Sequence, residues 1–157
     1  MDHSFAPVFD VSFVTPYLAV GSLPKKAEYT YLQEIGVKLI INMIFFRGNG
    51  TACTIPVLRL RSFDNPFVPI PLSAMIKGAE AGAALIRQQE KVLVHCMHGK
   101  HRSPAMATAI LIALGYSLDD AIAMIKKVRP AARPDAFYIK RRIIAFERVW
   151  KNTRTPF

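Results

Sequence analysis

Short runs of aliphatic residues alternate along this chain with segments in which apolar residues recur every three or four positions. The first pattern is typical of strands, and the second is typical of helices that bury one face. Two apolar stretches on either side of Thr15-Pro16 predict an early hairpin, and the dense aliphatic run 37–43 predicts a strand buried on both faces. The predicted strands cover residues 11–14, 17–20, 37–43, 57–61 and 91–95.

Helices are predicted between and after these strands, where start and stop signals flank the periodic segments. Ser103 and Pro104 suit the N-cap and first position of one helix, and Ser117, followed by acidic residues, begins another. Gly78 and Gly82 each cost a helix about 1 kcal/mol relative to alanine, so we expect close packing there. The predicted helices cover residues 25–35, 73–89, 103–114 and 117–129, with a last one starting near 134.

This alternation predicts an α/β domain with a central sheet of four to five mostly parallel strands and helices on both faces. The segment 64–71 contains three prolines and is predicted to be a loop. The chain has 157 residues, is 52% hydrophobic and shows no repeat, linker or low-complexity segment. We therefore expect a single domain over residues 1–157.

The candidate chemistry lies where the strand 91–95 meets the next helix. Cys96 and Arg102 are separated by five residues, and Ser103 follows directly. A strand that leads into a helix N-terminus turns successive backbone N–H groups towards one point, where the helix dipole also favours negative charge. Cys96 is a nucleophile as its thiolate, and the guanidinium of Arg102 can bind two phosphoryl oxygens. The segment predicts a site that holds a phosphate dianion and attacks its phosphorus.

Within this segment Gly99 lets the backbone curl tightly, and the Ser103 hydroxyl can donate a hydrogen bond to the sulfur. The alternative is a structural cysteine at a strand end beside an unrelated arginine, but it explains neither the glycine nor the capped helix. The expected phosphate ligands are the residues of the loop and the following arginine, namely Met97, His98, Gly99, Lys100, His101 and Arg102.

The string from His95-Cys96 to Arg102-Ser103 matches the signature of the cysteine-dependent protein tyrosine phosphatases. The rest of the chain resembles their small dual-specificity branch, in the segments 17–22, 39–43 and 115–137. This resemblance implies a phosphocysteine mechanism that uses no metal or cofactor. It also implies that Ser103 assists turnover of the phosphoenzyme. The larger domain and phosphotyrosine-recognition loop of the classical tyrosine phosphatases are missing, so we expect a shallow, permissive pocket.

The resemblance also implies a general acid, an aspartate about thirty residues before the cysteine in a loop after a strand. Asp64 lies 32 residues before Cys96, follows the predicted strand 57–61 and is the only acidic residue between Glu34 and Glu80. A turn-capping role before Asn65-Pro66 is the alternative. We expect Asp64 to act first as an acid and then as a base.

Other residues have weaker signals. The resemblance implies that His95 orients the loop and tunes the thiol, whereas a strand-end histidine with a backbone partner is the alternative. Asn42 either binds the phosphate loop, as in the family, or forms a turn. Cys53 is expected to be an ordinary residue rather than a redox partner of Cys96. Four arginines are candidates for the rim of the site: Arg129, Arg133, Arg141 and Arg142.

The residues of the loop leave the substrate open. Phosphotyrosine and phosphoserine or phosphothreonine in proteins are the default. The string from Gly99 to Arg102 is similar to a branch that cleaves inositol pyrophosphates. His98-Gly99 is similar to RNA 5′-triphosphatases, and Lys100 to lipid phosphatases. Inositol phosphates, phosphoinositides and RNA 5′-phosphates are therefore alternative substrates. A catalytically idle phosphate-binding module is a further alternative, although Cys96, Arg102 and Asp64 are all present.

Net charge, cysteine count and the lack of long apolar runs indicate the partners and the cellular compartment of the protein. The formal net charge of +10 and the pI near 10.0 favour anionic partners, but no pattern of alternating aromatic and basic residues supports obligate nucleic-acid binding. Two cysteines make no disulfide framework. No apolar run reaches the ~18 residues of a membrane span, and residues 1–4 do not resemble a signal peptide. We expect a cytoplasmic enzyme of unknown oligomeric state.

Overall fold

The computed structural model describes residues 9–154, so the residues 1–4 considered above lie outside the described part. Its core is a five-stranded sheet with the order β1-β2-β5-β3-β4. The four strands from β2 to β4 run parallel to their neighbours, and only β1 is antiparallel. The strands are β1 (Val11–Thr15), β2 (Leu18–Gly21), β3 (Val37–Ile44), β4 (Val57–Ser62) and β5 (Lys91–His95). The predicted α/β class and mostly parallel sheet are confirmed.

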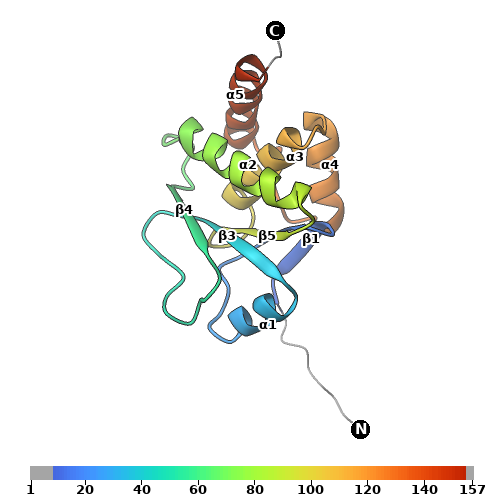
Figure 1. The fold of residues 1–157 in the computed structure, drawn as a ribbon. Coiled ribbons are helices and arrows are strands. Elements are labelled where there is room, and N and C mark those ends of the chain that lie inside the picture. Colours follow the sequence, from blue (N-terminus) through green and yellow to red (C-terminus); the bar gives the residue numbers. More distant parts are fainter. Residues whose placement is uncertain (1–8, 155–157) are drawn as a thin grey trace.

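Helices cover both faces of this sheet, but unequally (Figure 1). One face carries only α1, and the other carries the remaining four helices, with α3 at the centre of that layer. The helices are α1 (Glu28–Glu34), α2 (Leu72–Arg87), α3 (Arg102–Ala113), α4 (Leu118–Val128) and α5 (Phe137–Thr153). None of the helices in the described part of the chain has both the length and the hydrophobicity needed to cross a bilayer.

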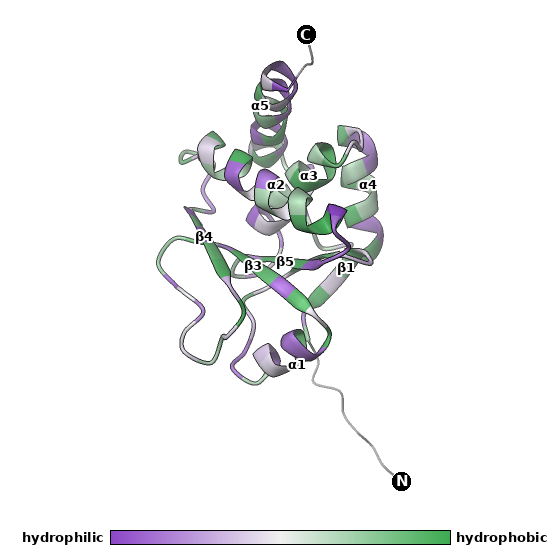
Figure 2. Cartoon of the chain, in the orientation of Figure 1, coloured by the Kyte–Doolittle hydropathy of each residue, from purple (hydrophilic) through white to green (hydrophobic). Residues whose placement is uncertain are grey.

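Successive side chains of the central strands point to opposite faces of the sheet and so contribute to two hydrophobic cores. Val92 and Val94 of β5 face the four-helix layer, and Leu93 between them faces α1. Helix α3 is buried along its whole length, which agrees with its mostly apolar sequence. Figure 2 shows α3 and much of β3 and β4 as hydrophobic, whereas α5 alternates between hydrophobic and hydrophilic residues because only one of its sides packs.

The predicted close packing of the α2 glycines is confirmed. A Cβ atom on Gly78 would lie 2.5 Å from Sδ of Met106, and one on Gly82 would lie 2.7 Å from Cδ1 of Ile110. Both contacts are with α3, so the glycines let α2 approach the central helix more closely than alanine would.

Three helix starts differ from the prediction. Helix α3 begins at Arg102 with His101 as its N-cap, so Ser103 lies inside the helix and does not cap it. Helix α1 begins at Glu28 rather than at residue 25, because the Glu28 carboxylate accepts a hydrogen bond from the backbone N–H of Lys25 and closes a turn there. Helix α5 begins at Phe137 rather than near residue 134. Asp135 instead bonds the side chains of Lys126 and Arg133, which holds the chain in a turn before the helix.

Candidate active site

The candidate nucleophile lies at the carboxyl end of the central strand. Strand β5 ends at His95 and α3 begins at Arg102, so the residues between them form a loop at the edge where parallel strands end. Cys96 is 3% exposed at the base of this loop. A cavity of about 190 Å³ opens above it, lined by Asp64, Cys96, Met97, His98, Lys100, His101 and Arg102. Ligand sites of parallel sheets are expected at this edge.

Two polar groups lie within hydrogen-bond distance of the sulfur of Cys96. The backbone N–H of Gly99 donates to Sγ at 3.2 Å, and Oγ of Ser103 lies 3.3 Å from Sγ. The Ser103 hydroxyl also reaches the carbonyl oxygen of Gly21 at 3.3 Å. A hydroxyl has one proton, so it can donate to Gly21 while Cys96 is a thiol and to Sγ when Cys96 is a thiolate. This contact suits a sulfur that gains and loses negative charge.

Backbone carbonyl oxygens bind one nitrogen of the Arg102 guanidinium, Nη1, and leave another, Nε, without a partner among residues 9–154. Its side chain is buried, and its Nη1 donates to the carbonyl oxygens of Met43 at 3.2 Å and Ser62 at 2.7 Å, at the ends of β3 and β4. Its Nε has no hydrogen-bond partner among residues 9–154. A buried guanidinium N–H without a partner is unfavourable, and a bound oxyanion would satisfy it.

Arg129 lies beneath the loop instead of at its rim. It is 8% exposed, and it donates from Nε to the carbonyl oxygen of Gly99 at 2.8 Å and from Nη2 to that of His98 at 3.1 Å. Both oxygens of Asp10 accept from the same guanidinium at 2.9 Å. The hydrogen bond from Arg129 lowers the pKa of Asp10 below its usual value. The expectation that Arg129 is a rim residue was wrong.

These bonds account for the conformation of the loop. Gly99 has φ +66°, and a Cβ atom there would lie 2.3 Å from Nη2 of Arg129. Arg129 donates hydrogen bonds to the carbonyl oxygens of residues 98 and 99, so these carbonyls point away from the cavity. The backbone N–H groups of the loop can then face the sulfur, as that of Gly99 does. The sequence contains no signal for the Asp10 partner, which lies 119 residues away.

Asp64 is brought beside the loop, with both carboxylate oxygens occupied. Oδ2 lies 3.0 Å from Nδ1 of His101, and Oδ1 accepts from the Tyr138 hydroxyl at 2.8 Å. Burial alone would raise the pKa of Asp64, but these hydrogen bonds and the positive charges of His101 and Arg102 together keep it below its usual value. Burial, together with the adjacent carboxylate, raises the pKa of Tyr138 to about 12, so its hydroxyl remains a donor at neutral pH.

His101 therefore has a partner that the sequence did not indicate. It was expected among the phosphate ligands, and it does line the cavity. Its Nδ1, however, pairs with Asp64 rather than pointing towards the sulfur as a free donor. Lys100 and His98 are exposed and Met97 is half-buried, all three at the cavity.

His95 is fully buried between the loop and a turn. Its Nε2 lies 2.9 Å from Nδ2 of Asn49, and its Nδ1 lies 3.4 Å from the carbonyl oxygen of Cys96. Burial lowers the pKa of His95 to about 4, so the ring is neutral at pH 7. An amide NH₂ can only donate, so Nε2 must accept and the proton must sit on Nδ1. His95 thus contacts both the side chain of Asn49 and the backbone of Cys96.

Asn42 bonds the turn after β3, and within residues 9–154 it forms no hydrogen bond with the loop 96–102. Its Nδ2 donates to the carbonyl oxygen of Arg47 at 3.0 Å and to Oδ1 of Asn49 at 2.8 Å. The family-like contact implied for Asn42 is wrong, because the strand register places it opposite His95 with Asn49 between the two side chains. Asn49 lies between two glycines, a pattern typical of a turn, and nothing in that pattern indicates its contact with His95.

The remaining candidates lie away from the sulfur. Cys53 is a free cysteine packed against the core on the α1 side, and its thiol donates to the carbonyl oxygen of Ile55 at 3.4 Å. Burial raises the pKa of that thiol, which makes it less reactive. Arg133 pairs with Asp135. Arg141 and Arg142 line a separate cavity beside Tyr138.

Comparisons with known proteins agree with this geometry. Residues 20–149 match the family described as dual specificity phosphatase, catalytic domain. Mouse dual specificity phosphatase 28 is 32% identical over 123 residues, which cover 78% of this chain and 75% of the mouse protein. The human protein is also 32% identical over 123 residues, covering 78% and 69%.

Two solved structures have the same fold. A mouse putative dual specificity phosphatase, complexed with zinc tungstate, superposes with a TM-score of 0.85 at 27% identity, covering 98% of this chain and 96% of that one. Human DUSP28 superposes with a TM-score of 0.80 at 28% identity, covering 90% and 95%.

Proposed function

The chain belongs to the dual specificity phosphatases, a family of cysteine-dependent protein phosphatases, and we propose that it acts through a phosphocysteine on phosphotyrosine and phosphoserine or phosphothreonine in proteins. The observation that carries the mechanism is the contact of Sγ of Cys96 with the N–H of Gly99 and the hydroxyl of Ser103, in a loop that leads into Arg102. These groups stabilise negative charge on the sulfur and on a phosphoryl group above it.

In the first step the Cys96 thiolate attacks phosphorus. The S–P bond forms as the bond from phosphorus to the leaving oxygen breaks, and the proton of the Asp64 carboxyl passes to that oxygen. The free Nε edge of Arg102 and the N–H groups of the loop bind the phosphoryl oxygens. Arg102 is positioned for this because backbone carbonyls hold its Nη1.

In the second step a water molecule attacks the phosphocysteine. The Asp64 carboxylate takes a proton from this water, the S–P bond breaks, and inorganic phosphate leaves. The electron pair of that bond returns to the sulfur, where the Ser103 hydroxyl can turn from Gly21 to stabilise the thiolate. Each group therefore ends the cycle in the state in which it began.

The dimensions and partners of the site favour a protein substrate. The cavity of about 190 Å³ is open and bordered by exposed loop residues, which suits a phosphorylated side chain on a larger molecule. His101 is already paired with Asp64, which weakens the case for a loop specialised for several phosphates. Exposed Lys100 at the cavity remains the observation in favour of inositol phosphates or phosphoinositides.

Trapping the intermediate tests the mechanism. We expect rapid quenching of turnover on a small aryl phosphate to leave one phosphoryl group on the peptide that contains Cys96, as read by mass spectrometry. Cys96→Ser should abolish turnover while inorganic phosphate still binds. The matched control is Cys53→Ser, which should form the phosphopeptide at the wild-type rate. A phosphoryl group on another residue, or turnover by Cys96→Ser, would contradict the mechanism.

A substrate panel tests the class. We expect kcat/KM to be highest for phosphotyrosine and phosphothreonine peptides, compared with phosphoinositides, inositol pyrophosphates and triphosphorylated RNA at equal salt. A soluble inositol phosphate or lipid that exceeds every peptide by tenfold or more would reverse the assignment of substrate but leave the phosphocysteine chemistry in place.

A further inference from the structure

A second cavity lies directly beside the active site. It has a volume of about 270 Å³ and is lined by Pro66, Pro69, Tyr138, Arg141, Arg142 and Ala145. Tyr138 belongs to both sites, because its hydroxyl donates to Asp64 at 2.8 Å while its side chain lines the second cavity. A ligand that occupies the Cys96 cavity therefore has this second cavity as its neighbour, across the contact between Asp64 and Tyr138.

The second cavity is cationic. Two of its six lining residues are arginines and none is acidic. Neither Arg141 nor Arg142 forms an ion pair with a carboxylate within residues 9–154. Nε of Arg142 donates to the carbonyl oxygen of Ile70, which fixes that side chain against the loop. Two guanidinium groups that have no carboxylate partner within residues 9–154 attract an oxyanion to this cavity.

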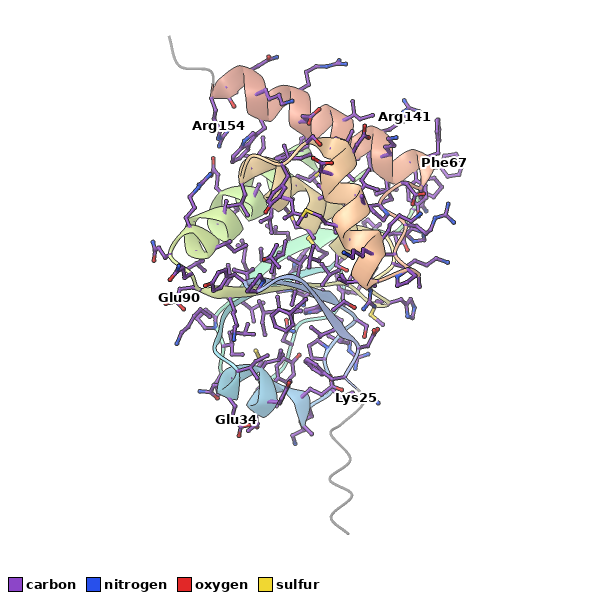
Figure 3. The ribbon with its side chains drawn as sticks, turned by 90° about the vertical axis from the view of Figure 1, so that its right-hand side faces the viewer. Lys25, Glu34, Phe67, Glu90, Arg141 and Arg154 are labelled. Carbon is purple, nitrogen blue, oxygen red and sulfur yellow. The ribbon has the colours of Figure 1, made fainter. Side chains whose placement is uncertain are left out.

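Exposed aromatic rings flank the same cavity. Phe67, next to the lining residue Pro66, is 90% exposed, and Phe137, next to Tyr138, is 76% exposed. The guanidinium of Arg141 lies over the Phe137 ring, 5.4 Å from its centre. Figure 3 shows Phe67 and Arg141 projecting at the same end of α5. Exposed apolar surface next to a polar pocket is typical of a surface that meets another molecule, and aromatic and arginine side chains are enriched at such interfaces.

We propose that the second cavity binds an acidic side chain of the phosphoprotein substrate, near the residue that is dephosphorylated. The oxyanion, a carboxylate or a second phosphate, pairs with Arg141 and Arg142, and an apolar neighbour in the substrate packs on Phe67 and Phe137. This assignment rests on the proposed protein phosphatase activity. It makes Arg141 a residue that selects among phosphorylated sites by their acidity.

Charge reversal provides the test. Four phosphotyrosine peptides are compared that differ at one nearby position, which carries glutamate, phosphoserine, glutamine or lysine. The position is moved along both sides of the phosphotyrosine. We expect the wild-type protein to favour the acidic peptides by about tenfold in kcat/KM at the best position, mainly through KM. Arg141→Glu should remove this preference and give a preference for a lysine peptide instead.

The matched control is Arg148→Glu, which makes the same charge change at an exposed position of α5 outside the cavity. It should keep the preference for acidic peptides. Equal loss in both variants would mean that general surface charge, not this cavity, discriminates, and the proposal would be wrong. The glutamate and phosphoserine peptides identify which oxyanion is preferred.

Two further outcomes separate this proposal from others. If the wild-type protein hydrolyses no peptide at all, the proposed protein phosphatase function has failed, whereas equal hydrolysis of acidic and neutral peptides overturns only the second site. If Arg141→Glu keeps the peptide preference but loses binding to vesicles that contain anionic phospholipid, the surface meets a membrane and not a substrate protein. The ratio between peptides is measured within each variant, so partial unfolding of a variant does not alter the reading.

Discussion

Nε of Arg129 donates a hydrogen bond to the carbonyl oxygen of Gly99 at 2.8 Å, and this bond fixes the direction of the backbone around Cys96. Residue 129 follows α4, and Gly99 lies in the loop between β5 and α3, so the bond joins two separate parts of the fold. Asp10, directly before β1, completes the arrangement by accepting hydrogen bonds from Nη1 and Nη2 of the same guanidinium. Arg129 is a positioning residue because it acts through the loop and not on the substrate.

Replacing Arg129 should therefore weaken oxyanion binding. We expect Arg129→Met to reduce kcat/KM by roughly 100-fold, because displacing a catalytic group by about 1 Å can cost that much, and to raise the inhibition constant of inorganic phosphate. Stability should fall by about 2 kcal/mol as buried hydrogen bonds to a charged group are lost. Arg129→Lys should be intermediate, since an ammonium lacks the planar fork. Wild-type phosphate affinity in Arg129→Met would contradict the positioning role.

Asp10→Asn serves as the companion variant. It weakens the ion pair but leaves the bonds from Arg129 to Gly99 and His98 in place. We expect it to lower stability by less than Arg129→Met, because the carboxylate is 57% exposed and exposed pairs contribute only about 0–1 kcal/mol. Activity should fall only a few-fold. Equal losses of activity in the two variants would indicate that the pair acts as one unit.

Loss of the Asp64 carboxyl should depend on the leaving group. We expect Asp64→Asn to lower kcat by about 10²–10⁴-fold for phosphate esters with poor leaving groups. Aryl phosphates with acidic phenols should be affected much less, because their oxygen leaves without a proton. Steady-state rates on a series of substituted aryl phosphates measure this. An equal effect across the series would place the general acid elsewhere.

The hydrogen bond from Tyr138 to Asp64 should appear in the pH profile. This bond lowers the pKa of Asp64, so Tyr138→Phe should raise it. A general acid must be protonated in the free enzyme, and kcat/KM falls as pH rises through its pKa. The descending limb of the profile should therefore move to higher pH in Tyr138→Phe. A limb that stays in place would show that Asp64 does not control it.

Burial of neutral His95 should make the fold less stable in acid. Its folded pKa of about 4 lies below the ordinary value of 6.5, so the unfolded chain binds a proton that the folded chain does not. The stability due to the neutral ring is complete above pH 6.5 and is lost as pH falls towards 4. The loss is on the order of 3 kcal/mol. Denaturant unfolding between pH 7 and 4 measures this.

The comparison for this measurement is His95→Asn, which should show a shallower decline because the titrating ring is gone. His98→Asn, at an exposed position of the loop, should decline in parallel with the wild-type protein. If His95→Asn and the wild-type protein decline with the same slope, the buried ring does not account for the acid sensitivity.

The contact between α2 and α3 should not tolerate an added methyl group. In Gly78→Ala the new Cβ would lie 2.5 Å from Sδ of Met106 and 2.8 Å from Cδ1 of Leu60. Overpacking typically costs about 1–3 kcal/mol, against a gain in helix propensity of about 1 kcal/mol. We expect a net loss of about 1 kcal/mol in unfolding free energy. Lys77→Ala, exposed on the same helix, should stay within about 0.5 kcal/mol.

The strand-loop-helix segment could be read from sequence because its parts are neighbours in the chain. The apolar run of β5, Gly99 and the start of α3 determine the local backbone, and that backbone brings Cys96, the N–H groups and Arg102 together. The position of Asp64 could also be anticipated, since its distance from Cys96 along the chain follows the pattern of the family.

The partners of these residues were decided only by the tertiary structure. Asp10 and Arg129 are 119 residues apart, and Asp64 and Tyr138 are 74 apart. Such contacts depend on strand order and helix packing, which carry no local pattern. The same packing buries Arg129, which looked like a rim residue, and turns His101 towards Asp64. The sequence by itself determined where the proposed nucleophile and the proposed phosphate loop lie, because backbone geometry is local. The tertiary structure decided what holds that loop and what lies beside it, because side-chain contacts join distant parts of the chain.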